Sequence, residues 1–191
     1  MRNQTKFIFL DRDGVICEEK SHLHKIEDFK LINRVANAIK LLNKNNCKVI
    51  VISNQSAIAK GICTQKDVDI LNNQMKEILN GKNAELDKIY FCPHHPTAGN
   101  NPIYTKECEC RKPKPGMIFQ AQKDFNIKNL SECYIIGDKM SDIYAGKAAG
   151  CKTILVKTGY GGKGNENLTD IEPSFHASDL YDAVAKIILQ K

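Results

Sequence analysis

Four consecutive apolar residues, Phe7 to Leu10, run directly into the sequence Asp11-Arg12-Asp13-Gly14. A short apolar run that ends in a polar turn predicts a strand buried on both faces of a parallel sheet. Such strands present functional residues at their carboxyl ends. In an extended chain Asp11 and Asp13 would point the same way and repel each other unless a cation lay between them. Mg²⁺ prefers oxygen ligands of this kind. The same stretch also fits a strand followed by an ordinary Asp-Gly turn.

The rest of the chain alternates between short apolar runs and amphipathic stretches. The apolar runs predict strands at residues 48–52, 88–91, 133–136 and 152–156, with a short one at 175–176. Apolar residues at helical spacing predict helices at residues 35–46, 65–79, 115–125, 141–149 and 179–189. Thr64 and Ser178 are expected to cap the helices that follow them, and Ile78 is expected on a buried helix face. Strands that alternate with helices predict an α/β fold with a mostly parallel sheet covered on both faces.

Length and composition suit one globular domain. A chain of 191 residues is long enough to bury one core, so we expect a single domain over residues 1–191. The hydrophobic content of 42% is too high for a disordered protein. Apolar runs of at most four residues cannot cross a membrane, and the first residues lack the apolar core of a secretory signal. We therefore expect a cytoplasmic protein with no membrane partner.

The formal net charge of +6 comes from lysines that are scattered along the chain. Such a charge could suit a nucleic acid or an anionic metabolite, but no nucleic-acid-binding motif accompanies the lysines, so we interpret it as a solvated surface with some attraction for phosphate. We also expect the protein to be a monomer.

A second group of candidate metal ligands lies in the long loop from residue 92 to 114. It consists of Cys92-Pro93-His94-His95 and, later in the loop, Cys108-Glu109-Cys110. Three cysteines and one of the two histidines would supply the four ligands of a tetrahedral zinc site. A site without an open position is structural and would stabilise a loop that has no core of its own. Free thiols are the alternative. The other cysteines are more typical of packing positions: Cys17, Cys47, Cys63, Cys133 and Cys151.

Polar residues beside the predicted strand ends form a series that resembles a known family. Asp11-Arg12-Asp13-Gly14, Ser53, Lys112 and the run Gly137 to Asp142 resemble, in this order, the four motifs of the haloacid dehalogenase-like (HAD) phosphatases. Four motifs in order are stronger evidence than any one of them. The resemblance covers most of the chain and implies a Rossmann-like HAD fold with a mostly parallel sheet flanked by helices.

The resemblance also implies catalytic roles. Asp11 would be the nucleophile that forms an aspartyl phosphate intermediate. Asp13 would protonate the leaving alcohol and later take a proton from the attacking water. Ser53 and Lys112 would donate hydrogen bonds to the phosphoryl oxygens, over which the charge is spread in the transition state.

The same motifs imply a magnesium site. Mg²⁺ would be held by Asp11, the carbonyl group of Asp13 and Asp138, and would shield the charge of the phosphoryl group. Three roles stay open for Asp142: orienting Lys139, orienting a metal-bound water, or capping the helix that follows.

Three further segments narrow the resemblance. Ser53-Asn54-Gln55-Ser56, the Cys/His loop and the run Cys110 to Gly116 resemble the D-glycero-D-manno-heptose 1,7-bisphosphate 7-phosphatases. That family lacks a large cap domain, and its Cys-x-His pattern favours His94 over His95, so the zinc ligands would be Cys92, His94, Cys108 and Cys110. Carried over by position, the substrate-binding rim comprises Glu19, Lys20, Ser21, His22, Asn54, Gln55, Ser56 and Arg111.

The chain departs from the family pattern at a few positions. Val15 and Cys17 follow the first motif, Ser53 replaces a threonine, and Ala57 replaces a glycine. Serine keeps the hydroxyl group, whereas Ala57 would alter the loop.

The resemblance implies an enzyme that uses Mg²⁺ and Zn²⁺ and removes the 7-phosphate of the heptose bisphosphate. The product, heptose 1-phosphate, would lead to nucleotide-activated heptose for the bacterial surface and its lipopolysaccharide. Two alternatives stay open. One is a histidinol-phosphate phosphatase, which shares the zinc loop. The other is a non-catalytic module that binds a phosphosugar, although binding alone needs no nucleophile.

Overall fold

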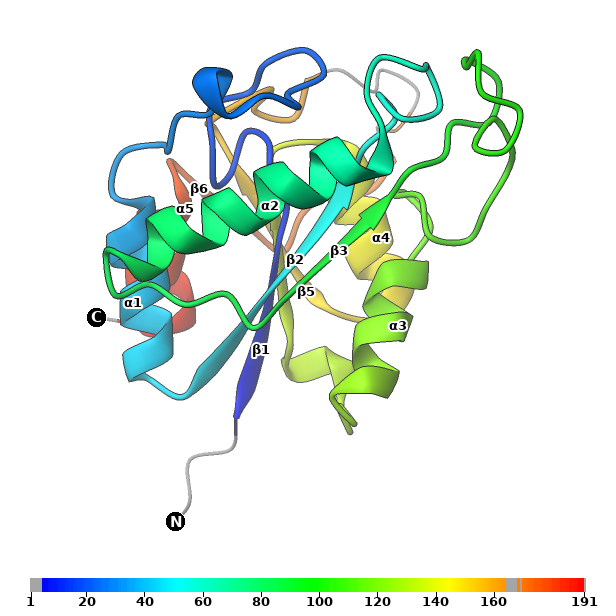
Figure 1. Ribbon diagram of the computed structural model, residues 1–191. Helices are drawn as coiled ribbons and strands as arrows, with labels where there is room; N and C mark the ends of the chain where they lie inside the picture. Colours follow the sequence, from blue (N-terminus) through cyan, green and yellow to red (C-terminus); the bar gives the residue numbers. More distant parts are fainter. Residues whose placement is uncertain (1–4, 164–167, 169, 191) are drawn as a thin grey trace.

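The computed structural model describes residues 5–163, 168 and 170–190. These residues form a six-stranded sheet in the order β3-β2-β1-β4-β5-β6, in which all neighbouring strands are parallel (Figure 1). The strands are β1 (Lys6–Leu10), β2 (Cys47–Asn54), β3 (Lys88–Cys92), β4 (Tyr134–Gly137), β5 (Lys152–Val156) and β6 (Phe175–Ala177). The parallel α/β fold predicted from the sequence is confirmed.

Helices cover both faces of the sheet (Figure 1). One face is covered by α1 (Val35–Lys44), α2 (Gln65–Asn80), α5 (Leu180–Asp182) and the π-helical segment η3 (Ala183–Ile188). The other face is covered by α3 (Gly116–Asp124) and α4 (Met140–Ala149). Two short 3-10 turns are η1 (Ile26–Asp28) and η2 (Leu130–Glu132).

Successive residues of the central strands point to opposite faces, and both faces are buried. Ile8 and Leu10 of β1 belong to the apolar core that includes α1, whereas Phe9 belongs to the core that includes α3. All three side chains are fully buried. A strand buried on both faces needs apolar residues at every position, which explains the uninterrupted apolar run before Asp11.

The helix ends follow the local sequence, with two corrections. Thr64 and Asp67 form a reciprocal capping box at the start of α2, as expected for Thr64. The cap of α5 is Asp179 and not Ser178, because the helix starts one residue later and the Asp179 side chain accepts from the backbone N–H of Asp182. Ile78 is also misplaced in the prediction: it is 36% exposed at the edge of the buried stripe of α2.

The loop between β3 and α3 contains neither helix nor strand, and all its residues are described. A single β-bridge joins His95 to Thr105, and the N–H groups of Asn100 and Asn101 donate to the carbonyl of Ala59. The loop is therefore attached to the segment that follows β2. In the part of the chain that is described, the connections after β1 and β2 hold only η1 and the helices α1 and α2, so no large cap domain covers the carboxyl edge of the sheet. None of the helices seen here has the length and apolar character needed to cross a bilayer.

Candidate active site

Three carboxylates converge at the carboxyl edge of the sheet. Asp11 follows β1, Asp138 follows the neighbouring strand β4, and Asp142 lies in the first turn of α4. One oxygen from each lies within 4.8 Å of the others. Burial, together with the negative charges of Asp11 and Asp142, raises the pKa of Asp138 to about 8. Carboxylates this close together repel one another unless a cation binds between them.

Within the described part of the chain, Asp138 has the burial and the unpaired oxygen that are expected of a metal ligand. Its side chain is fully buried, and its Oδ1 atom has no hydrogen-bond partner among the described residues. Its Oδ2 atom accepts from the backbone N–H of Tyr160 at 2.8 Å. A buried carboxylate oxygen without a donor is destabilising unless a cation binds it. The three carboxylates therefore fit a hard divalent cation such as Mg²⁺.

Two glycines allow the backbone to close around Asp138. Gly14 has a φ of +83° and Gly159 a φ of +59°, and a Cβ atom at either position would overlap the Asp138 carboxylate. The Asp-x-Asp-Gly turn therefore requires its glycine for two reasons, a left-handed backbone and close approach to a carboxylate.

Lys112 places a buried ammonium group beside these carboxylates. Its Nζ atom lies 3.0 Å from Asp11 Oδ1 and 2.5 Å from Asp142 Oδ1, and it donates to the carbonyl of Ile52 at 2.8 Å. Burial lowers the pKa of Lys112, but the charges of Asp11 and Asp142 outweigh burial and hold it above its ordinary value. The lysine is therefore charged at the floor of the site.

Asn54 and Asp142 hold Lys112 in place. The Asn54 side chain donates to the Lys112 carbonyl at 2.9 Å and accepts from the Lys112 N–H at 3.1 Å. Asp142 accepts from the backbone N–H of Lys139 with Oδ2 and pairs with Lys112 through Oδ1. Of the three roles left open for Asp142, the structure supports the helix cap, and it adds the ion pair with Lys112.

Asp13 lies in a different environment from Asp11. Its carboxylate accepts from Arg12 Nε and Nη2 at 3.1 and 3.0 Å, from Gln55 Nε2 at 2.9 Å and from the thiol of Cys17 at 3.4 Å. Burial raises the pKa of Asp13, but the Arg12 guanidinium and the hydrogen bonds outweigh this and lower it below its ordinary value. Gln55 Nε2 also donates to Ser53 Oγ at 2.9 Å.

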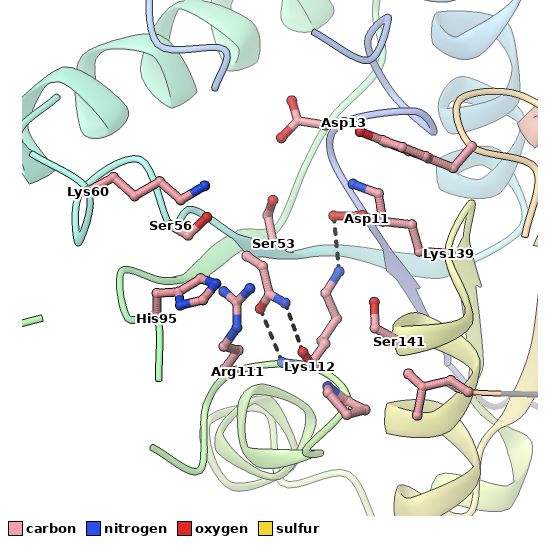
Figure 2. A pocket seen from close by; sticks show the side chains of 14 residues that line it. Asp11, Asp13, Ser53, Ser56, Lys60, His95, Arg111, Lys112, Lys139 and Ser141 are labelled. Atoms are coloured by element: carbon pink, nitrogen blue, oxygen red, sulfur yellow. Dashed lines mark hydrogen bonds and ion pairs between the residues drawn. The ribbon is translucent and has the colours of Figure 1, made fainter. Parts of the chain in front are cut away.

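A cavity of about 480 Å³ opens above these groups (Figure 2). Asp11, Asp13, Ser53 and Lys112 line its floor. Its rim carries Lys60, Ser56, His95 and Arg111 on one side and Lys139 on the other. Burial and the positive charges of Arg111 and Lys60 lower the pKa of His95. The rim is therefore an electropositive surface suited to an anionic ligand.

A smaller recess of about 150 Å³ adjoins the cavity and shares Asp13, Lys139 and Tyr160 with it. It is lined by residues predicted to form the substrate rim: Glu19, Lys20, Ser21, His22, Asn54, Gln55 and Ser56. Glu19 accepts a hydrogen bond from Lys139 at 3.2 Å, and the Lys139 ammonium lies 4.2 Å from the centre of the Tyr160 ring. These contacts join the loop after β1 to the loops after β4 and β5.

The Cys/His loop brings four potential metal ligands together. One ligand atom from each of Cys92, His94, Cys108 and Cys110 lies within 4.8 Å of the others. The Cys92 and Cys110 sulfur atoms are 3.2 Å apart, and His94 Nδ1 lies 3.5 Å from the Cys110 sulfur. This closed set of three sulfurs and one nitrogen fits a structural tetrahedral zinc site.

His95 is turned away from this cluster. Its Nδ1 atom accepts from the backbone N–H of Ala98 at 2.8 Å, and its ring lines the cavity. Arg111 follows the last cysteine and donates to the carbonyl of His94 at 3.0 Å. The cluster therefore lies next to the residues of the loop that face the cavity.

Comparison with known proteins agrees with this geometry. A family profile described as HAD-hydrolase-like matches residues 109–183. The D-glycero-alpha-D-manno-heptose-1,7-bisphosphate 7-phosphatase of Photorhabdus laumondii is 42% identical over 159 residues, which cover 83% of this chain and 86% of that protein. The D-glycero-D-manno-heptose-1,7-bisphosphate 7-phosphatase of Chlorobaculum tepidum is 37% identical over 189 residues, 96% of this chain and 94% of that protein. The chain belongs to the heptose-1,7-bisphosphate 7-phosphatase family.

A solved structure of the same family has the same fold. The D,D-heptose 1,7-bisphosphate phosphatase of B. bronchiseptica, complexed with magnesium and phosphate, is 28% identical in sequence and superimposes with a TM-score of 0.84. The match covers 97% of this chain and 99% of that one. The HAD-like fold predicted from the motifs is thereby confirmed.

The structure places the predicted substrate-binding residues around the cavity and the recess beside it, but some of these side chains face inward. Asn54 and Gln55 line the recess, yet their amides are bonded to Lys112, Asp13 and Ser53. The prediction from sequence did not place five residues in the active site. Four of them line the cavity, and the fifth, Arg12, supports Asp13: Lys60, His95, Lys139, Tyr160 and Arg12. Lys139 and Arg12 lie inside the recognised motifs, so the motifs themselves pointed to them. For Lys60 and Tyr160 the sequence contains no comparable signal.

The carboxylate cluster predicts a pH-dependent stability of the metal-free protein. The pKa of Asp138 is about 8 in the folded state, against about 4 for an unfolded chain. The folded protein thus keeps a proton that the unfolded chain loses, and the free energy of unfolding falls as the pH rises from 4 to 8. In EDTA, Asp138→Asn should raise this free energy at pH 8, on the order of 2 kcal/mol, and flatten the pH dependence.

Urea denaturation at pH 5 and pH 8 measures this effect. Asp69→Asn, at an exposed position of α2, is the matched control and should behave like the wild type. An Asp138→Asn variant with the wild-type pH dependence would show that the carboxylates do not repel each other in the folded state.

Proposed function

We propose that this protein is a Mg²⁺-dependent phosphatase that removes the 7-phosphate of D-glycero-D-manno-heptose 1,7-bisphosphate and leaves heptose 1-phosphate. The observation that carries the proposal is the arrangement of Asp11, Asp13 and Lys112 at the floor of a cavity with a separate positively charged rim. The family relatives named above for this activity support it.

Asp11 is the nucleophile in this proposal. Its carboxylate attacks the phosphorus atom, a bond forms between Asp11 and phosphorus, and the bond from phosphorus to the sugar oxygen breaks. The Ser53 hydroxyl donates to the phosphoryl oxygens, where negative charge is spread in the transition state. Lys112 donates to them with the N–H that pairs with Asp11, because this N–H is released as the Asp11 carboxylate bonds to phosphorus. Lys112 suits this role because it is held as a charged group beside Asp11.

Asp13 transfers protons in this proposal. A phosphoryl dianion beside its carboxylate favours the protonated form, since like charges disfavour ionisation. The Asp13 carboxyl gives this proton to the departing sugar oxygen. A water molecule then attacks the phosphorus atom of the aspartyl phosphate and gives a proton back to Asp13. The bond between phosphorus and Asp11 breaks, so inorganic phosphate leaves and the Asp11 carboxylate is restored.

Mg²⁺ fits the carboxylate cluster, with Asp11, Asp138 and the carbonyl group of Asp13 as its ligands. When bound, it shields negative charge on the phosphoryl group. Asp142 lies within the same cluster, but its pairing with Lys112 assigns it to holding that lysine.

The rim favours a second phosphate group on the substrate. Lys60, His95 and Arg111 line the same side of the cavity as Ser56 (Figure 2). A bisphosphate can place one phosphate at Asp11 and the other at the Lys60 ammonium and the Arg111 guanidinium, where the planar guanidinium can bind two oxygens. Histidinol phosphate would instead bring an ammonium group toward a positive surface, which is unfavourable.

Zinc has a structural role in this proposal. Cys92, His94, Cys108 and Cys110 would hold it and thereby fix the loop that carries His95 and Arg111 into the cavity. We further propose that the chain acts as a single domain, as a cytoplasmic monomer, in the supply of nucleotide-activated heptose.

Asp11→Asn tests the chemistry. The amide keeps the shape of the side chain but is a poor nucleophile. We therefore expect kcat to fall by about 1000-fold or more, because covalent catalysis through Asp11 would be lost. Phosphate release from the heptose bisphosphate is the measurement, and Asp69→Asn is the control. Wild-type turnover by Asp11→Asn would exclude the aspartyl phosphate. A wild type that binds the sugar without releasing phosphate would instead be a binding module.

Metal analysis tests the zinc site. Purified protein should contain about one zinc ion per chain, the content of one closed four-ligand site. Cys108→Ser should lose the zinc and lower both the melting temperature and the turnover. Cys63→Ser, which changes a cysteine outside the cluster, should keep it. Active protein that contains no zinc would show that neither the loop nor the activity requires this metal.

Arg111→Ala tests which substrate the rim serves. It should lower kcat/KM for the heptose bisphosphate by about 100-fold but for 4-nitrophenyl phosphate by less than about 5-fold, since only the former reaches the rim. Equal losses would assign Arg111 to the chemistry. Comparison of kcat/KM for heptose bisphosphate and for histidinol phosphate decides the substrate. A higher value for histidinol phosphate would overturn the heptose assignment.

A further inference from the structure

Arg12, between the two aspartates of the first motif, is one of the most deeply buried side chains of the protein. It is only 1% exposed, although it carries a full positive charge. Burying a charge is costly unless it is fully paired, so the residues around Arg12 must satisfy it. The guanidinium pairs with both oxygens of Asp13, through Nε and Nη2 at 3.1 and 3.0 Å. Two parallel bonds define the position of a carboxylate in a way that one bond does not.

The remaining donors of Arg12 reach three other segments. Nη1 donates to the Asn72 side chain on the buried face of α2 at 3.2 Å. The second N–H of Nη2 is shared between two acceptors, the carbonyl of Leu23 at 3.1 Å, in the loop that forms the recess, and Gln55 Oε1 at 3.0 Å. Arg12 thus joins the end of β1 to α2, to the end of β2 and to the recess loop.

The bond to Gln55 sets the direction of its amide. Because Gln55 Oε1 accepts from Arg12, its Nε2 atom faces Asp13 and Ser53 and donates to both at 2.9 Å. Ser53 Oγ therefore accepts a hydrogen bond from inside the protein. Its own proton is left to donate into the cavity that Ser53 lines.

We propose that Arg12 is a positioning residue for the phosphatase reaction: it holds the Asp13 carboxyl group where the leaving oxygen needs a proton and, through Gln55, turns the Ser53 proton toward the phosphoryl group. Arg12 itself exchanges no proton and touches no substrate, since its side chain is enclosed by protein. The inference rests on the proposed phosphatase chemistry but not on the identity of the sugar.

The dependence of the rate on the leaving group tests this role. Phenyl phosphate releases a poor leaving group that needs a proton, whereas 2,4-dinitrophenyl phosphate releases a good one that does not. Arg12→Lys keeps the charge but replaces the planar fork by a single point charge. It should lower kcat/KM for phenyl phosphate by about 100-fold, and for the dinitrophenyl ester by less than about 10-fold. Arg34→Lys, at an arginine that pairs with Asp179 away from the site, should change neither.

A double variant separates positioning from a general structural effect. If Arg12 aids the leaving group through Asp13, the ratio of the rates on the dinitrophenyl and phenyl esters should be no larger for the pair Arg12→Lys and Asp13→Asn than for Asp13→Asn alone, whereas a loss through Ser53 lowers both rates alike. Gln55→Met removes one donor to Asp13 and leaves the charge of Arg12 unchanged, so it should also increase the dependence on the leaving group. This variant serves as the test if Arg12→Lys does not fold.

Equal losses on both esters for Arg12→Lys, or a larger ratio of the two rates in the double variant than in Asp13→Asn, would overturn the proposal and leave Arg12 as a structural residue. A wild type that hydrolyses the aryl esters but not heptose bisphosphate would refute the proposed sugar while this experiment still decides the role of Arg12. A wild type that hydrolyses no ester would refute both, because no proton transfer would remain for Arg12 to position.

Discussion

The buried ion pairs of Lys112 with Asp11 and Asp142 are the interactions on which the arrangement of the site depends. Asp11, Asp138 and Asp142 come from β1, β4 and α4, and their oxygens lie within 4.8 Å of one another. Three buried carboxylates at this distance would oppose the packing of the elements that carry them. Lys112 offsets part of this repulsion, and a divalent cation can offset the rest. Positive charge at this edge of the sheet is therefore needed both for the stability of the fold and for the proposed function.

The two aspartates of the first motif are only two residues apart, yet the fold gives them different partners. Asp11 faces the Lys112 ammonium and the carboxylate cluster, whereas Asp13 is held by Arg12 and Gln55. Different environments allow chemically identical groups to take different roles, which is what the proposed mechanism asks of Asp11 as nucleophile and Asp13 as proton donor. Arg12 and Lys112, both buried, thus act on opposite sides of one short turn. The loop of the Cys/His cluster supplies Lys112 and also Arg111, so one loop reaches both the floor and the rim of the cavity.

Much of this fold could be predicted because the residues concerned are constrained locally. The continuous apolar run of Phe7 to Leu10 required a strand buried on both faces, and Thr64 capped α2 as expected. One error lies where two neighbouring residues were equally suitable: Ser178 and Asp179 are both good caps, and the helix is capped by Asp179. Arg12 was overlooked because a charged residue in an Asp-rich turn usually points into solvent, and its burial depends on Asn72, sixty positions away.

The sequence by itself determined the order of strands and helices, the four HAD-like motifs and the composition of the Cys/His cluster, because each depends on residues close together in the chain. Only the tertiary structure decided which groups meet. It placed Lys112 between Asp11 and Asp142, turned His95 to the cavity while His94 joined the cysteines, and directed the amides of Asn54 and Gln55 into the protein. These outcomes depend on distances between segments that are far apart in the chain. Such distances are set by the packing of the sheet and its helices, which no local pattern of residues encodes.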